Sequence, residues 1–213
     1  MTLRRRLELL EWAQGAGAWI IEDDYDSEYR YQSRPIASLQ GLDPDARVIY
    51  VGTFSKVLFP SMRIGYMVVP QDLLDRFLSV RQTIDVSQSD LNQAVLAKFI
   101  EEGHFARHIR RLRAIYAERR SVLESSIRKV FGDELQILGD QSGMHLTVTL
   151  PAGMNDVQIA HRAAERELWL WPLSRYYLGE SVRQGFLLGY GGVAAQDIPR
   201  AVRLLHQVIH EIS

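Results

Sequence analysis

The chain has 213 residues, of which 46% are hydrophobic and 24% charged, and its formal net charge is −1. This composition is typical of a globular protein and excludes a disordered or collagen-like chain, and the small net charge gives no global field that would attract nucleic acid. The sequence contains no cysteine, which excludes disulfides and thiolate sites, and no apolar run approaches the ~20 residues of a membrane-spanning helix. We expect a cytoplasmic protein that does not contact a membrane.

The first hundred residues have the pattern of an α/β region. A helix is expected over residues 2–16, where leucines recur at helical spacing, Thr2 can cap the start, and Gly15 and Gly17 can end the helix. Buried strands are expected over residues 19–21, 48–53 and 64–69, with proline- and glycine-containing loops over residues 33–46 and 54–62. Two amphipathic helices, over residues 71–84 and 89–102, complete this region.

A long helix is expected over residues 104–131, and an α+β region follows it. The outer face of this helix is rich in arginine: Arg107, Arg110, Arg111, Arg113, Arg119 and Arg120. These arginines could bind DNA phosphates, but Glu118 and apolar residues interrupt them, so a solvated face or a protein interface is favoured. Strands are then expected over residues 136–138, 145–150, 168–172 and 185–188, with helices over 155–166 and 196–212. The predicted organisation is residues 1–103, a connecting helix over 104–131, and a small domain over 132–213.

Lysine is rare in this chain, which makes one lysine informative. Only Lys56, Lys98 and Lys129 occur among 25 basic residues, and arginine cannot form an imine. Two predicted buried strands end in groups that could hold a ligand: Asp23, Tyr25, Thr53, Ser55, Lys56 and Arg63. Ligands bind outside the carboxyl ends of strands in open α/β sheets. Hydroxyls and an arginine suit a phosphate, a lysine suits an aldehyde, and a carboxylate suits a protonated pyridine nitrogen, which together describe pyridoxal 5′-phosphate (PLP).

The sequence also offers two alternatives in which a metal ion is bound. The acidic run Asp23, Asp24, Asp26 and Glu28 could bind magnesium through oxygen ligands, but nothing else in the sequence supports a metal. His104 and His108 share a helix face at i, i+4 spacing, yet no third ligand is evident, so surface or capping roles are favoured. We therefore expect no metal site.

Two motifs together carry a family resemblance. WIIEDDYDSEYRY, followed about thirty residues later by VIYVGTFSKVLFPSMRIGYMVVP, resembles the aminotransferase-like domain of the MocR subfamily of GntR-type regulators. The likeness continues through LNQAVLAKFIEEGHFARHIRRLRAIYAERRSVL to LLGYGGV. It implies an α/β fold, the C-terminal part of a fold-type I PLP-dependent transferase, with a partial large-domain sheet and a small C-terminal α+β domain.

The resemblance also implies roles for individual residues. Lys56 matches the lysine that forms an imine with PLP, Asp23 the partner of the pyridine nitrogen, and Tyr25 the partner of the ring oxygen. Thr53, Ser55 and Arg63 fall in the phosphate-binding neighbourhood, and Arg175 lies where such regulators can hold an effector carboxylate. Ordinary aminotransferases hold that carboxylate with an arginine in the strand that here reads GFLLG, over residues 185–189, and this departure favours a regulator.

The resulting expectation is an effector-sensing, PLP-binding fragment of a MocR-type regulator. Its partners would be an amino-acid or amine effector, a second copy in a homodimer, and DNA only through an N-terminal winged-helix domain that this chain does not contain. Two alternatives remain: a PLP-dependent aminotransferase of amino acids, in which Lys56 also acts as general base, and an inactive truncated remnant.

Overall fold

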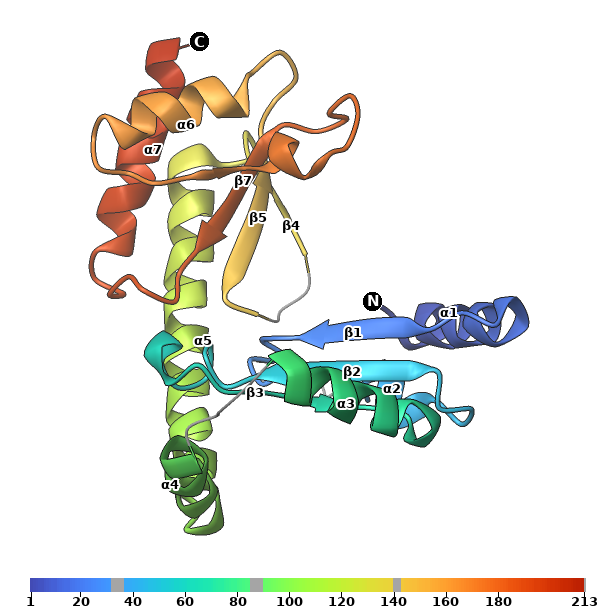
Figure 1. The fold of residues 1–213 in the computed structure, drawn as a ribbon. Coiled ribbons are helices and arrows are strands. Elements are labelled where there is room, and N and C mark those ends of the chain that lie inside the picture. Colours follow the sequence, from blue (N-terminus) through green and yellow to red (C-terminus); the bar gives the residue numbers. More distant parts are fainter. Residues whose placement is uncertain (32–36, 85–89, 140–142, 213) are drawn as a thin grey trace. The chain divides into compact units, whose positions relative to one another are not determined.

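The computed structural model describes residues 1–31, 37–84, 90–139 and 143–212, which fall into two compact units (Figure 1). The first unit comprises Met1–Glu28 and Ser33–Ile109, and the second comprises Tyr29–Gln32 and Arg110–Ser213. Helix α5 (His104–Phe131) has the predicted bounds and contributes residues to both units. The three-part division drawn from the sequence therefore stays a prediction, and each unit is described by itself.

Helix α1 (Leu3–Ala16) opens the first unit as predicted. The Thr2 hydroxyl accepts a hydrogen bond from the Arg5 amide at 3.3 Å, which satisfies one of the amides that the first turn leaves without a partner. Gly17 ends the helix with a φ of 62°, a left-handed conformation that glycine adopts without steric cost.

A three-stranded sheet follows, made of β1 (Ile20–Asp24), β2 (Val48–Thr53) and β3 (Gly65–Val68) in the order β1-β2-β3. Strands β1 and β2 are parallel, whereas β2 and β3 are antiparallel. Helix α2 (Leu39–Leu42) lies in a segment expected as loop, and the Ser38 hydroxyl caps it by accepting from the Gly41 amide at 3.0 Å. Residues 33–36 of the expected loop lie outside the described residues. Leu10, Leu39 and Val48 form a small apolar cluster between α1, α2 and the sheet.

The other face of this sheet is open at its β1 side among the described residues, which corrects part of the sequence-based expectation. Ile21 was expected in a buried strand, but its side chain is 72% exposed. All four residues of β3 are exposed too. The apolar pattern of these strands correctly indicated β-structure, but burial depends on which elements cover a face. The described part of the first unit buries Val48 and Ile49 of the central strand and leaves Ile21 and β3 exposed.

The remaining elements of the first unit are short or helical. A 3₁₀ turn, η1 (Pro60–Met62), precedes β3, and η2 (Gln71–Leu73) leads into helix α3 (Leu74–Ile84). Helix α4 is described over Asp90–Glu101, and Ser89, the expected first residue of that helix, lies outside the described residues. No helix in the described ranges combines the length and apolarity that crossing a membrane requires.

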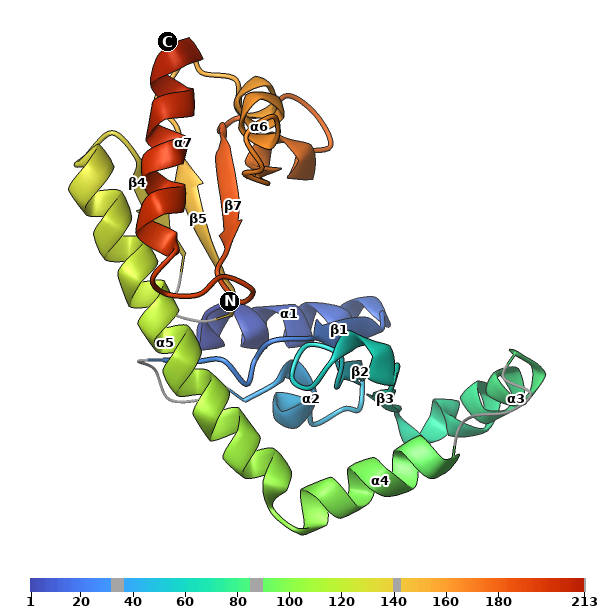
Figure 2. The same ribbon diagram turned by 90° about the vertical axis from the view of Figure 1, so that its left-hand side faces the viewer.

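The second unit is a small α+β layer structure (Figures 1 and 2). Its antiparallel sheet has the order β4-β5-β7-β6, formed by β4 (Gln136–Leu138), β5 (His145–Thr149), β6 (Trp171–Pro172) and β7 (Gly185–Gly189). Helices α6 (Asp156–Ala164) and α7 (Ile198–Ile212) pack with α5 against this sheet around one apolar core. Strand β6 is shorter than the expected strand over residues 168–172.

Arg120 is buried, which corrects the expectation that it lies with the arginines of the outer face of α5. Its residue is only 7% exposed, whereas Arg110, Arg111 and Arg113 are exposed. Arg120 lies four residues after Tyr116 and three before Leu123, so it falls on the same helix face as the buried stripe. Its aliphatic stem packs there, and its Nη1 atom is buried without a hydrogen-bond partner among the described residues.

Candidate functional site

The predicted ligand site starts where the parallel strands β1 and β2 end (Figure 1). Asp23 pairs in register with Val51, and Thr53 is the last residue of β2, two positions further along. Because strand side chains alternate between faces, Asp23 and Thr53 point to the same face of the sheet. Strand spacing and rise place their Cα atoms roughly 8 Å apart, a separation that suits a planar ligand with a polar group at each end.

The acidic residues of β1 divide into two groups by this alternation. Glu22 accepts hydrogen bonds from the amides of Leu39 at 2.9 Å and Gln40 at 3.0 Å, and it pairs with Arg6 at 3.1 Å. Asp24 accepts from the Tyr50 hydroxyl at 2.8 Å. Glu22 and Asp24 therefore hold the fold together on the covered face.

Asp23, by contrast, is exposed on the open face and has no hydrogen-bond or ion-pair partner among the residues the structure describes. Its carboxylate is available to a ligand. The magnesium alternative gains no support, because the acidic run does not gather three ligand atoms in the described chain.

The Tyr50 hydroxyl holds the Asp24 carboxylate in a hydrogen bond. Burial raises the pKa of the Tyr50 hydroxyl well above its usual value, and the hydrogen bonds with Asp24 and Tyr66 act in the same direction. The phenol therefore remains a donor to Asp24 across the whole neutral range. Tyr66 lies over Gly52 on the neighbouring strand, where a Cβ atom would come within 2.4 Å of the tyrosine ring.

The loop that carries Lys56 is held on both sides of the lysine. The Ser55 amide donates to the Thr53 hydroxyl oxygen at 3.1 Å, which leaves the hydroxyl proton of Thr53 for another acceptor. The Val57 side chain is fully buried, and its carbonyl oxygen accepts a hydrogen bond from Nε2 of His108 at 2.9 Å. Lys56 itself is exposed. The loop thus presents a solvent-accessible amine on an anchored backbone.

His108 contacts the loop that carries Lys56, and the sequence alone does not reveal this contact. The sequence assigned it a surface or capping role on α5, yet it bonds to the residue directly after Lys56. Phe105, one turn earlier, packs edge-on against Phe54 with ring centroids 5.9 Å apart. The i, i+3 spacing of Phe105 and His108 indicates a shared face, but only the fold shows what that face contacts.

Arg63 lies beside this loop in a strained backbone conformation. The pairing of Thr53 with Gly65 brings the segment before β3 alongside the loop after β2, and the Phe54 amide bonds to the Ile64 carbonyl at 3.0 Å. Arg63 is exposed and has a φ of 52°, a left-handed value that is uncommon for residues other than glycine. Strained backbone conformations of this kind concentrate at ligand-binding positions, where the side chain has to be held in one place.

Two substitutions of Arg63 distinguish the free energy that its left-handed backbone conformation costs from the contribution of its charge. We expect Arg63→Gly to unfold at a higher denaturant concentration than Arg63→Ala, with a difference of about 1 kcal/mol, because glycine tolerates a positive φ. Both variants should lose affinity for PLP to the same extent, since both lack the guanidinium. Chemical denaturation and PLP titration would check this pair, and equal stability of the two variants would contradict the strain.

The other two predicted site residues are placed as follows. Tyr25 directly follows β1 and is 44% exposed. Arg175 belongs to the second unit, where it lies exposed on the 3₁₀ turn η3 (Leu173–Tyr176) with no ion-pair partner among the described residues. Ser174 fixes this turn, because its amide and hydroxyl both bond to the buried Asp156 carboxylate, at 2.9 and 2.6 Å. Arg175 is therefore an exposed cation on an anchored turn.

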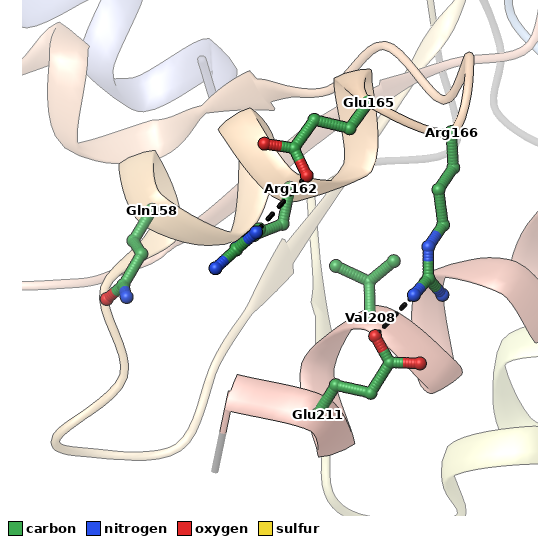
Figure 3. Close-up of a pocket in the computed structure, with 6 residues that line it drawn as sticks. All are labelled: Gln158, Arg162, Glu165, Arg166, Val208 and Glu211. Atoms are coloured by element: carbon green, nitrogen blue, oxygen red, sulfur yellow. Dashed lines mark hydrogen bonds and ion pairs between the residues drawn. The ribbon is translucent and has the colours of Figure 1, made fainter.

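A polar hollow of about 460 Å³ lies between α6 and α7 in the second unit (Figure 3), and its lining residues are Gln158, Arg162, Glu165, Arg166, Val208 and Glu211. Arg162 pairs with Glu165 at 3.3 Å, and Arg166 pairs with Glu211 at 2.5 Å. Both arginine charges are compensated by carboxylates, so the hollow does not resemble an anion site.

Comparisons with known proteins agree with the sequence and the fold. The chain matches the family described as aminotransferase class I and II over residues 1–187. The HTH-type transcriptional regulator YhdI of Bacillus subtilis is 42% identical over 205 residues, which cover 96% of this chain and 44% of YhdI. The probable rhizopine catabolism regulatory protein MocR of Rhizobium meliloti is also 42% identical, over 96% of this chain and 42% of MocR.

A solved structure gives the same result for the fold. The kynurenine aminotransferase of Pyrococcus horikoshii superimposes with a TM-score of 0.91 at 29% identity, over 100% of this chain and 52% of that enzyme. The chain thus spans about half the length of the relatives it matches. The predicted fold class and the resemblance to the aminotransferase-like domain of MocR-type regulators are confirmed. This chain belongs to the PLP-dependent aminotransferase class I and II family.

Proposed function

We propose that this chain is the PLP-binding, effector-sensing part of a MocR-type transcriptional regulator, in which Lys56 forms an imine with PLP and an amino compound displaces the lysine. Two HTH-type regulators at 42% identity support this proposal. Because those proteins are more than twice as long as the matched region, the proposal includes DNA binding by a winged-helix domain outside these residues. It also includes a homodimer as the working form.

The proposal rests on the Asp23 carboxylate. It has no hydrogen-bond or ion-pair partner among the described residues, and it lies beside the loop that carries Lys56. Glu22 and Asp24 are held by the fold, whereas Asp23 faces the open side of the sheet near Thr53. The residues present fit PLP, because its pyridine nitrogen requires a carboxylate and its phosphate requires cations and hydroxyls at the opposite end.

Each residue then has a defined task. Asp23 would hold a proton on the pyridine nitrogen, and Tyr25 would donate to the ring oxygen. Thr53, Ser55 and Arg63 would bind the phosphate, with the free hydroxyl proton of Thr53 as one donor. Arg175 would bind the carboxylate of an amino-acid effector. The cofactor, when bound, supplies an electron sink and an aldehyde that reacts reversibly with amines.

An aminotransferase is the second candidate, and the likeness to kynurenine aminotransferase at a TM-score of 0.91 supports it. In that case Lys56 would move a proton at the substrate α-carbon. Strand β7 argues against it, because its residues Gly185–Gly189 read GFLLG and include no arginine. An inactive remnant is the third alternative.

Spectroscopy with product analysis separates the three alternatives. We expect the chain to bind PLP with an absorbance band of the imine, and amino compounds to shift this band without forming a keto acid. Catalytic keto-acid formation from any amino acid would establish the aminotransferase instead. The absence of an imine band at millimolar PLP would establish the remnant.

Asp23→Asn tests the carboxylate directly. The neutral amide cannot stabilise a protonated pyridine nitrogen, so we expect PLP affinity to fall by about 1.5–3 kcal/mol, the range for one charge-assisted hydrogen bond. Reactivity of the bound cofactor towards amines should fall further. Asp45→Asn, which removes an exposed acid of the same unit, is the matched control. Titration of the imine absorbance measures the PLP affinity of both variants, and equal affinity would count against the assignment.

A further inference from the structure

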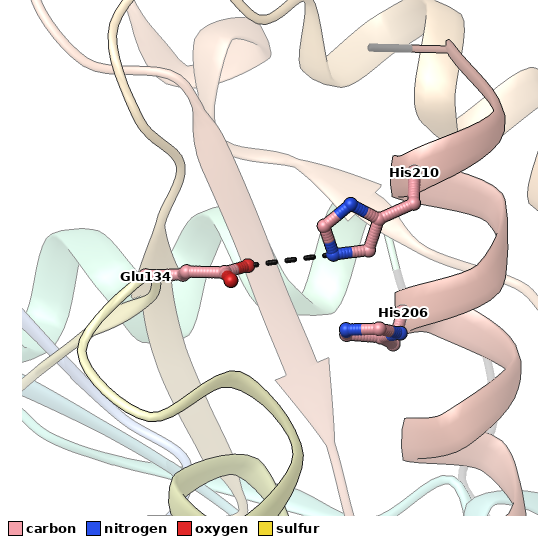
Figure 4. A group of neighbouring side chains, drawn as sticks. All are labelled: Glu134, His206 and His210. Atoms are coloured by element: carbon pink, nitrogen blue, oxygen red, sulfur yellow. Dashed lines mark ion pairs between the residues drawn. The ribbon is translucent and has the colours of Figure 1, made fainter.

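Three potential metal ligands converge on one surface of the second unit (Figure 4). His206 and His210 lie on α7, and Glu134 lies in the turn between α5 and β4. One ligand atom from each residue falls within 4.8 Å of the other two, and among the described residues no other group of three does so. This cluster takes no part in the proposed PLP site.

The two histidines are held on one face of α7. Residues four apart are neighbours on a helix, and the imidazole centroids are 4.2 Å apart. His206 packs edge-on against the buried Phe131, with centroids 5.1 Å apart, and this contact restricts its ring. His210 is more exposed than His206.

The backbone of Glu134 is fixed while its side chain remains accessible. The Glu134 amide donates to the Phe131 carbonyl at 2.9 Å, and the next residue, Leu135, is only 5% exposed in the apolar core. A Glu134 carboxylate oxygen lies 3.5 Å from Nε2 of His210. In a tetrahedral zinc site, with bonds of ~2.0–2.1 Å, neighbouring ligand atoms are about 3.3–3.5 Å apart, so this pair is already at ligating separation.

We propose that Glu134, His206 and His210 bind a divalent transition-metal ion of the zinc class, with solvent in the remaining position. Two imidazoles and one carboxylate select such an ion over magnesium or calcium, which prefer oxygen ligands. Closing the site requires the exposed Glu134 and His210 side chains to move together towards His206 by rotamer adjustment. A bound ion would connect the end of α5 to α7, two segments that are distant in the sequence. This proposal departs from the sequence-based expectation of no metal site.

Titration of the 213-residue chain with Co²⁺, followed by competition with Zn²⁺, tests the site without PLP, since PLP itself binds metal ions. We expect one Co²⁺ per chain with the visible absorption of a low-coordinate site, displaced by Zn²⁺. His210→Ala and Glu134→Gln should each weaken Zn²⁺ binding at least tenfold, because each removes one of three ligands. Circular dichroism would show that these exposed substitutions leave the fold intact.

Two other histidine variants serve as controls. His161→Ala removes an exposed helical histidine of the same unit, and His104→Ala removes a histidine that pairs with Glu102 at 3.2 Å without a second imidazole. Neither should change the affinity for Zn²⁺. The proposal is overturned if the chain binds no Zn²⁺ below millimolar concentration, or if the His210 and Glu134 variants bind it as tightly as the controls.

Discussion

Lys56→Ala is expected to abolish covalent attachment of PLP to this chain. Lys56 is an exposed amine on an anchored loop, next to the cation and hydroxyl groups that suit a phosphate. The two other lysines lack such a setting: Lys98 pairs with Glu101 at 3.3 Å on the surface of α4, and Lys129 is exposed near the end of α5. Neither lies beside a carboxylate and a hydroxyl cluster at a strand end.

Borohydride reduction in the presence of PLP, followed by peptide mapping, measures this directly. The native chain should carry the label on Lys56, and Lys56→Ala should carry none at equal PLP concentration. Lys98→Ala is the matched control and should label like the native chain. Label distributed equally over the three lysines would show that PLP reacts with surface amines only, and the proposed function would fail with it.

Asp156→Ala is expected to destabilise the second unit by about 3–5 kcal/mol. Asp156 is fully buried, and its carboxylate accepts from the Ser174 amide and hydroxyl and from the Gly185 amide at 3.0 Å. Removing the carboxylate leaves three buried or partly buried donors without an acceptor, and each costs up to about 1–3 kcal/mol, partly relieved by water and local rearrangement. Thermal and chemical denaturation would measure the loss.

The same substitution should also affect the turn that carries Arg175. Ser174 precedes Arg175 directly, so loss of the Asp156 contacts releases η3. We expect faster amide hydrogen exchange at residues 173–177 in Asp156→Ala, at temperatures where the chain remains folded. Glu180→Ala, an exposed acid of the same unit, should leave stability and exchange unchanged. A loss of stability below 1 kcal/mol would show that water or another acceptor replaces the carboxylate.

The sequence predicted well those helices whose bounds are set by residues within or next to the helix itself. The Thr2 cap, the glycine at position 17 and the periodic leucines gave α1 its bounds. The bounds of α5 followed from the helical pattern between Gly103 and Gly132. Helix α2 was missed, because the segment that forms it contains Gly41 and its amides are held by the distant Glu22 carboxylate.

Burial and tertiary groupings could be predicted less well, because they depend on residues far apart in the chain. Periodicity alone would have placed Arg120 on the buried face of α5, but its charge argued for solvent. The spacing of His206 and His210 is visible in the sequence, whereas their proximity to Glu134 is not. The anchoring of Val57 by His108 likewise joins two segments that only the fold brings together.

The alternation along β1 also constrains how this gene region can change over evolutionary time. Glu22, Asp23 and Asp24 read as a redundant acidic run, and a substitution within it alters one side chain only. A deletion or insertion of a single codon before Asp23 would instead exchange the faces, turning Asp23 towards Tyr50 and placing the neighbouring acid on the open side. We therefore expect homologous sequences to vary in the identity of the flanking residues far more readily than in the number of residues between Ile20 and Asp24.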